Sequence, residues 1–291
     1  MLASVLQVVY NGVLLGGIYA LISMGLTLIF GVMNVVNFAH GEFLMISMYM
    51  AFWLYHFFGI HPYVSLVLIM PAMFIIGLIT QKGLIQRLIE AGHFAQIFAT
   101  VGLGMVLQNG ALFLWTADFR GVYTEIGAHS LNVGGGRLST SRVLALIAAI
   151  LVMVGLLVFL KKTRIGLAMR AISQNGRAAW LMGINVNQVY MIAFGIGSLC
   201  VGVAGAMLIP VYSVFPTVGS YFVLIAFVVV VLGGMGDIVG AFVSGIIIGL
   251  IETVGGYVMA PRLGVLCVFV LFVVILLFMP SGIRVKSRTD S

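Results

Sequence analysis

A short run of polar residues interrupts the apolar sequence near the amino-terminal end of this chain. Asn34, Asn37, His40 and Glu42 lie within nine positions and have Gly41 among them. Amide, imidazole and carboxylate groups need protein partners at membrane depth, because lipid offers them no hydrogen bonds. A cluster of such groups where helical periodicity stops indicates the polar wall of a cavity. Hydrogen bonding between packed helices is the alternative, and it is at least as common.

The cluster does not resemble a metal site. His40 has no second ligand at position i+4, and the remaining histidines and acids show no metal-binding spacing. Cys200 and Cys267 both lie in apolar runs and are read as small core residues. The sequence therefore predicts neither a metal site nor a disulfide framework.

Two further acids lie in or beside apolar runs. Asp237 ends a glycine-rich turn that contains Gly233, Gly234 and Gly236, and Glu252 lies in the run GIIIGLIETVGG. Acids inside a bilayer are costly and are often functional. For Asp237, an interfacial position with a loop partner is the competing interpretation, whereas Glu252 is expected to serve helix packing or gating.

The composition identifies the solvent of this chain as lipid. The sequence is 63% hydrophobic and only 7% charged, and its mean hydropathy is +1.25. A soluble domain is about 45–50% apolar and about 25% charged, and could not bury this much apolar surface. We expect an all-α, polytopic membrane protein, built as a single transmembrane permease domain over residues 1–291.

Apolar runs of the length needed to cross a bilayer recur along the chain. They predict about nine transmembrane helices, within a range of eight to ten, at 6–30, 35–58, 63–80, 95–116, 143–160, 188–212, 220–232, 238–259 and 263–279. The second run begins at the polar cluster, so it is expected to be broken or re-entrant. Small residues four positions apart, at Gly12 and Gly16 and at Gly245 and Gly249, predict closely packed helices.

The distribution of basic residues sets the orientation. The loop 161–187 carries five of the 14 basic residues within 17 positions. Placing this loop and the tail 280–291 in the cytoplasm puts ten basic residues inside and four outside, as the positive-inside rule requires. The polar stretch 117–142 and the amino terminus then lie outside.

A short helix is expected inside the basic loop. Asn175 is placed to cap its start, and Gly183 is placed to end it. Ala178, Leu181 and Met182 share one small apolar face of this helix. An apolar helix that projects into the cytosol usually contacts a protein there, and the alternative is that it lies on anionic lipid.

The sequence also lacks the means to bind ATP through a P-loop, because it contains no G-x-x-x-x-G-K-[ST] motif. Two interrupted apolar segments, near 30–41 and near 233–237, are weakly similar in character. Paired interruptions of this kind point to a transport site.

Three segments together resemble a known family. Residues 36–43 (VNFAHGEF), 166–184 (GLAMRAISQNGRAAWLMGI) and the part of 226–252 that includes LGGMGDIVGA are similar to motifs of the branched-chain amino-acid permeases of bacterial ABC importers. The segments occur in order and at fitting distances over most of the chain. Within this family the chain resembles the shorter of two permease subunits, which implies a multi-pass protein of the bacterial inner membrane.

The resemblance implies partners as well. A periplasmic binding protein would deliver the amino acid, a second permease subunit would complete the passage as a heterodimer, and two cytoplasmic ATPase subunits would hydrolyse the ATP. The chain would be a transporter subunit with no catalytic residue and no cofactor. The family's acidic start of the glutamate-alanine-alanine motif is replaced here by Arg177.

Two sets of site residues follow. The residues expected to couple the chain to the ATPase are Arg170, Asn175, Arg177, Ala178, Ala179, Leu181 and Gly183. The residues expected to line the substrate pathway are Asn34, Asn37, His40, Gly41 and Glu42, and those expected to serve packing or gating are Gly233, Gly234, Gly236, Asp237 and Glu252. Permeases for urea, amides or other amino acids stay open as alternatives. So does an ion-coupled secondary transporter in which Glu42, Asp237 or Glu252 binds the ion.

Overall fold

The computed structural model describes residues 2–89, 91–124, 129–133 and 136–278. Its helices are α1 (Leu2–Met33), α2 (His40–Phe58), α3 (Pro62–Thr80), α4 (Gln86–Leu88), α5 (His93–Trp115), α7 (Thr140–Lys162), α8 (Arg164–Leu181), α9 (Val186–Leu208), α10 (Val218–Gly233), α11 (Ile238–Val258) and α12 (Gly264–Phe278). A π-helical turn (Gln81–Ile85) follows α3, and a 3-10 turn (Pro261–Leu263) precedes α12. Strands β1 (Ser130–Val133) and β2 (Gly136–Ser139) form an antiparallel hairpin that pairs Asn132 with Arg137.

The prediction of a polytopic α-helical membrane protein is confirmed. Seven helical segments in the described part of the chain are long and apolar enough to cross a bilayer, and α10 is a shorter apolar helix of 16 residues. The described residues thus hold seven long apolar helices and one shorter one, and the 19-residue α2 lies in addition at the second predicted run.

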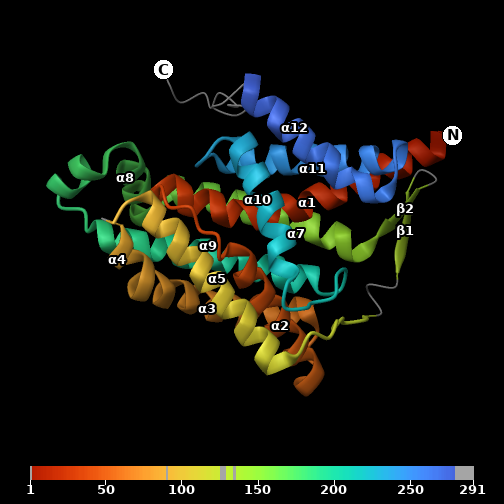
Figure 1. The fold of residues 1–291 in the computed structure, drawn as a ribbon, viewed down its shortest axis with the longest axis horizontal. Coiled ribbons are helices and arrows are strands. Elements are labelled where there is room, and N and C mark those ends of the chain that lie inside the picture. The colour runs from red at the N-terminus through yellow and green to blue at the C-terminus, as the bar shows by residue number, and fades with distance from the viewer. Residues whose placement is uncertain (1, 90, 125–128, 134–135, 279–291) are drawn as a thin grey trace.

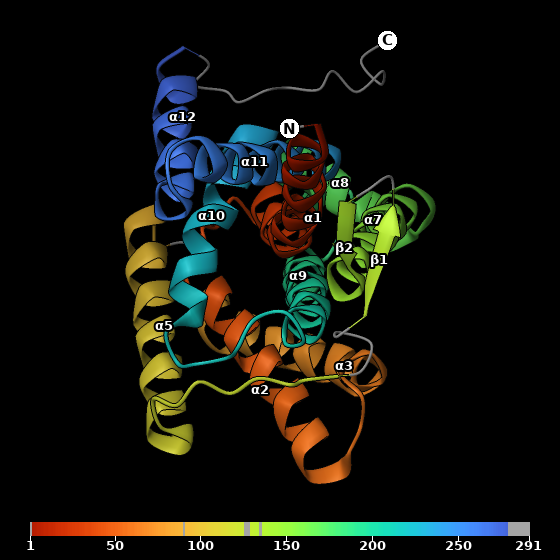
Figure 2. The ribbon, with the colours of Figure 1, turned by 90° about the vertical axis from the view of Figure 1, so that its right-hand side faces the viewer.

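Two helices form the centre of the bundle. The spanning segment of α1 is 89% buried and that of α9 is 78% buried, whereas that of α12 is 11% buried. Viewed along the bundle, α1 and α9 lie in the middle, with α5 and α12 at the edge (Figure 2). A helix that is apolar all round belongs either in a core or in lipid, and α1 occupies the core.

The α1–α11 contact depends on small residues, as the sequence predicts. A Cβ atom on Gly16 would lie 2.5 Å from the Cα atom of Ile246, and one on Gly245 would lie 2.7 Å from the backbone nitrogen of Ala20. Any side chain at either glycine would therefore force the two helices apart. Close backbone approach replaces the hydrophobic driving force that lipid removes.

The two ends of the bundle differ in charge and structure. The helices α4 and α8, which carry or adjoin most of the described basic residues, lie at one end, and the amino terminus lies at the other with the β-hairpin (Figure 1). Gln7 fixes the start of α1 to the hairpin, because its amide accepts from the Arg137 backbone N–H and donates to the Arg137 carbonyl, each at 2.8 Å. We call the α8 end the inner end, as the basic residues require. The basic tail 280–291 lies outside the described residues.

Two stretches that the sequence analysis treated as loops are more ordered than expected. Most of 161–187 is helical, because α7 continues to Lys162 and α8 begins immediately after Thr163. The Thr163 hydroxyl caps this second helix by accepting from the Gly166 N–H at 3.0 Å. The stretch 117–142 contains the β-hairpin and the first residues of α7.

Candidate functional site

The chain leaves its helical path between α1 and α2, as the polar cluster predicts. Asn34 has a left-handed backbone (φ 52°), and residues 34–39 form no helix. His40, the first residue of α2, donates from Nε2 to the carbonyl of Ile22 at 3.0 Å. Ile22 lies eleven residues before the end of α1, or about 16 Å at a rise of about 1.5 Å per residue. The segment 34–39 therefore runs back along α1, and α2 begins inside the membrane.

A second helix also begins beside this point. A side chain on Gly41 of α2 would collide with the backbone of Gly219 in the first turn of α10, and the reverse collision also holds. Nearby, a Cβ atom on Gly31 would lie 2.6 Å from the Cα atom of Gly236. The two interrupted segments that the sequence singled out are thus in direct contact, from opposite ends of the chain.

Four of the five predicted pathway residues are buried at this junction: Gly41 and the three polar residues Asn37, His40 and Glu42. Asn37 and His40 have no exposed surface and Glu42 is 6% exposed. Within the described residues, Asn37 Nδ2 and His40 Nδ1 have no hydrogen-bond partner, while Asn37 Oδ1 accepts from the Ala39 N–H at 3.1 Å. Buried polar atoms without partners are uncommon and need an explanation. Gly104 of α5 faces the Glu42 carboxylate and leaves space beside it.

Gly41 and Asn34 have different roles. Gly41 provides the backbone contact with α10, and Asn34 is exposed at the end of α1, away from the buried cluster.

The glycine-rich turn between α10 and α11 is a structural element. Gly234 and Gly236 have φ angles of +88° and +97°, which a residue with a side chain adopts only under strain. Asp237 then caps α11, because its Oδ1 accepts from the backbone N–H groups of Val239 and Gly240 at 3.0 and 3.1 Å. Gly233 meets the backbone of Gly240, which closes the turn.

The inner-end helix α8 consists of two parts. Asn175 has a non-helical backbone (φ −156°, ψ 97°), and its Oδ1 accepts from the Ala178 N–H at 3.0 Å. Gly183 ends the second part with a φ of +83° and donates to the Trp180 carbonyl at 2.9 Å. The caps predicted at Asn175 and Gly183 are both present.

The second part of α8 presents an apolar tip. Trp180, Leu181 and Met182 are 65%, 72% and 83% exposed, and we call these three residues the α8 tip. Ala178 is exposed beside them, whereas Ala179 is buried and faces the bundle. Sequence reasoning missed Trp180, although its position in the string RAAWLMG was a usable signal.

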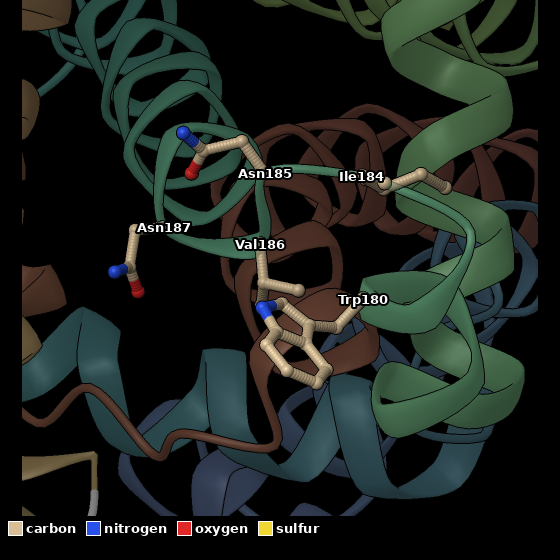
Figure 3. A pocket seen from close by; sticks show the side chains of 6 residues that line it. Trp180, Ile184, Asn185, Val186 and Asn187 are labelled. Atoms are coloured by element: carbon tan, nitrogen blue, oxygen red, sulfur yellow. The ribbon is translucent and has the colours of Figure 1, made fainter.

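A pocket of about 400 Å³ lies behind the α8 tip. The indole of Trp180 enters it from the end of α8, and Asn185, Val186 and Asn187 approach it from the start of α9 (Figure 3). Arg170 and Arg177 are exposed on the same helix. Large exposed apolar side chains on a basic surface are typical of a contact with another protein.

The fold and these sites define a membrane transport protein. Interrupted helices that meet inside the bilayer are typical of membrane transport proteins. Among the described residues, no group of three His, Cys, Asp or Glu side chains is arranged to hold a metal ion.

The chain belongs to the family described as the permease component of the branched-chain amino acid transport system, which it matches over residues 8–278. The high-affinity branched-chain amino acid transport system permease proteins BraD of Pseudomonas aeruginosa and LivH of Escherichia coli K12 are each 31% identical to it, over 98% of this chain and 97% of their own. A probable LivH of Methanocaldococcus jannaschii is 28% identical over 89% of this chain and 83% of its own. No solved structure matches the chain. The resemblance drawn from the three sequence segments is confirmed, and the chain is a multi-pass transporter subunit.

The capping role of Asp237 gives a prediction that separates capping from ion binding. Asn caps helices as well as Asp does but carries no charge, whereas Ala loses the cap at a cost of about 0.5–2 kcal/mol. Asp237→Asn is expected to keep uptake and thermal stability in detergent, and Asp237→Ala is expected to lower the stability. If Asp237→Asn abolishes uptake in correctly inserted protein, the carboxylate itself is required and Asp237 does more than cap α11.

Proposed function

We propose that this chain is one of two permease subunits of a bacterial inner-membrane importer that carries branched-chain amino acids. A periplasmic binding protein would supply the substrate, and two separate ATPase subunits would drive transport from the inner end. The observation that carries this proposal is the similarity to branched-chain amino acid permeases over almost the whole chain. The exposed α8 tip and the absence of a P-loop motif in the sequence support an external source of energy.

In this proposal the α8 tip contacts the ATPase. Leu181 and Met182 supply most of the exposed apolar surface, while Arg170 and Arg177 lie on the same helix. Asn175 and Gly183 hold the tip in place through their caps. Ala179 takes part through inward packing, because its side chain is buried.

Movement of the α8 tip has a direct route to the buried junction. Only a short turn separates α8 from α9, and α9 packs along α1, α2 and α3. The Ser47 hydroxyl of α2 donates to the Gly202 carbonyl of α9 at 2.7 Å, and Gly205 fits against Ser47 one turn later. A push on α8 would therefore displace α9 against the helix that carries His40 and Glu42.

The substrate pathway is proposed to pass the α2–α10 junction. An amino acid carries a carboxylate, an ammonium group and a side chain, and each needs a different surface. Asn37 Nδ2 is an unpaired donor for the carboxylate, and Glu42 is a carboxylate for the ammonium group. The aliphatic side chain needs only apolar wall, which the surrounding helices supply.

The coupling proposal predicts the effect of making the α8 tip polar. The double substitution Leu181→Ser, Met182→Ser is expected to reduce co-purification of the ATPase subunits and leucine uptake by about tenfold or more, since apolar anchors dominate such contacts. Membrane insertion should not change. The matched control is Met235→Ser, which replaces another exposed methionine at the inner end. Normal ATPase recovery with the double variant would refute the coupling role.

The pathway proposal predicts that Asn37 and His40 affect transport kinetics. Asn37→Ala and His40→Ala are each expected to lower kcat/KM for leucine uptake about tenfold, because each removes a hydrogen-bonding group from a desolvated path. Asn109→Ala is the control, since Asn109 is exposed on α5 and, among the described residues, its side chain donates to the Met105 carbonyl of its own helix. Unaltered kinetics in both test variants would place the pathway elsewhere.

A further inference from the structure

A second polar cluster joins three helices and adjoins the α2–α10 junction, because Tyr19 lies three residues before Ile22 and Tyr221 lies two residues after Gly219. The Glu252 carboxylate of α11 accepts from the Tyr19 hydroxyl of α1 at 2.7 Å and from the Tyr221 hydroxyl of α10 at 3.4 Å. The two hydroxyls also lie 3.4 Å apart. Two tyrosines 202 positions apart in the sequence thus hold one carboxylate in place.

Aromatic rings gather around this carboxylate. The Phe222 ring lies at centroid distances of 6.5, 5.6 and 5.1 Å from the rings of Tyr19, Tyr212 and Tyr221. These rings come from α1, from the connection between α9 and α10, and from α10 itself. Together with Glu252 we call them the Glu252 cluster.

The Glu252 carboxylate forms no ion pair among the described residues, although Arg142 lies near enough to Tyr212 to act on that residue electrostatically. In the described part of the chain the ion pair present is Arg120–Asp118, and no Lys, Arg or His side chain lies within 4.0 Å of Glu252. Two tyrosine hydroxyls use only part of the hydrogen-bonding capacity of a carboxylate. An unneutralised carboxylate at membrane depth is costly and marks a functional position.

The chemistry of the Glu252 cluster fits a primary ammonium group. Such a group carries a positive charge and three N–H donors, which match the free lone pairs of a carboxylate. The faces of tyrosine and phenylalanine rings also attract cations, by about 0.5–2 kcal/mol per favourable contact. Carboxylate and rings are present together here.

The position of the cluster makes it accessible from the outer end. Glu252 lies six residues before the end of α11 at Val258, or about 9 Å at a rise of about 1.5 Å per residue. Tyr221 is 42% exposed on the surface of this chain, so the chain itself does not enclose the cluster on that side. Glu42, in contrast, is almost fully buried at the start of α2. A substrate entering from outside would reach Glu252 before Glu42.

We propose that the Glu252 cluster is an outer binding site for the ammonium group of the transported amino acid. This inference rests on the proposed function, to which it adds a first binding position ahead of the α2–α10 junction. The competing role is a purely structural one, in which Glu252 only ties α11 to α1 and α10.

The test uses the purified complete importer and three small molecules of nearly equal shape. L-Leucine has both charged groups, 3-methylbutylamine has only the ammonium group, and 4-methylpentanoate has only the carboxylate. Thermal unfolding is measured against the concentration of each. The amine is expected to raise the unfolding midpoint, and 4-methylpentanoate is expected to have no effect at equal concentration.

Single substitutions test which residues of the Glu252 cluster bind the amine. Glu252→Gln keeps an acceptor for the tyrosines but removes the charge, so the half-maximal concentration of the amine should rise at least about tenfold. Tyr221→Phe should raise the half-maximal concentration of the amine severalfold. This variant tests the ammonium site if Glu252→Gln does not assemble. Tyr257→Phe, at an exposed position near the outer end of α11, is the matched control with an unchanged response.

Two results would overturn the inference. One is an equal response of the wild type to the amine and to 4-methylpentanoate. The other is an unchanged amine response in Glu252→Gln or, where that variant does not assemble, in Tyr221→Phe. If Glu252 has a purely structural role, Glu252→Gln would lower the unfolding midpoint measured without ligand but leave the half-maximal concentration of the amine unchanged. Leucine uptake by the wild-type importer is measured separately, so failure of the proposed function is distinguished from failure of the ammonium site.

Discussion

The structure depends on backbone-to-backbone contact through glycine inside the bilayer. Residues 34–39 leave the helical path at the inner end of α1 and run back to a depth where lipid satisfies no polar group, so protein must enclose the buried part of this segment. Contact of Gly41 with Gly219 and of Gly31 with Gly236 provides that enclosure. The same device holds α1 against α11 along its length. Without these contacts Asn37 and His40 would face lipid, and α2 could not begin where it does.

The arrangement links the inner end of the protein to its interior. The α8 tip is exposed and rigidly capped, and it is one short turn away from α9. The buried α9 contacts α2 through Ser47, and α2 carries His40 and Glu42 at its start. In the proposed importer, this connection would transmit movement from the ATPase at the α8 tip to the substrate pathway at the α2–α10 junction.

Local signals in the sequence predicted much of the fold and part of the candidate site. Apolar run lengths gave the spans, glycine spacing gave the α1–α11 seam, and Asn175 and Gly183 gave the caps of the α8 tip. Local signals could not predict which side chains far apart in the sequence contact one another. Tyr19 lies within an apolar run, and nothing local to it points to Glu252. Two local features were also not predicted. Asp237 was interpreted through its charge, although its carboxylate serves as the cap of α11. The basic residues of 164–174 were interpreted as part of a loop, although they form a helix.

The central claim is that the chain between α1 and α2 turns back into the bilayer and lies beside α10. The rings of Phe38 and Phe227 are in contact here, with centroids 4.7 Å apart and planes tilted by 36°. The direct measurement is cross-linking of Phe38→Cys with Phe227→Cys by a short bifunctional thiol reagent, in a chain whose Cys200 and Cys267 are replaced by serine. The account predicts an efficient bridge within one chain in native membranes. Both cysteines reacting singly with the reagent, with no bridge between them, would contradict it.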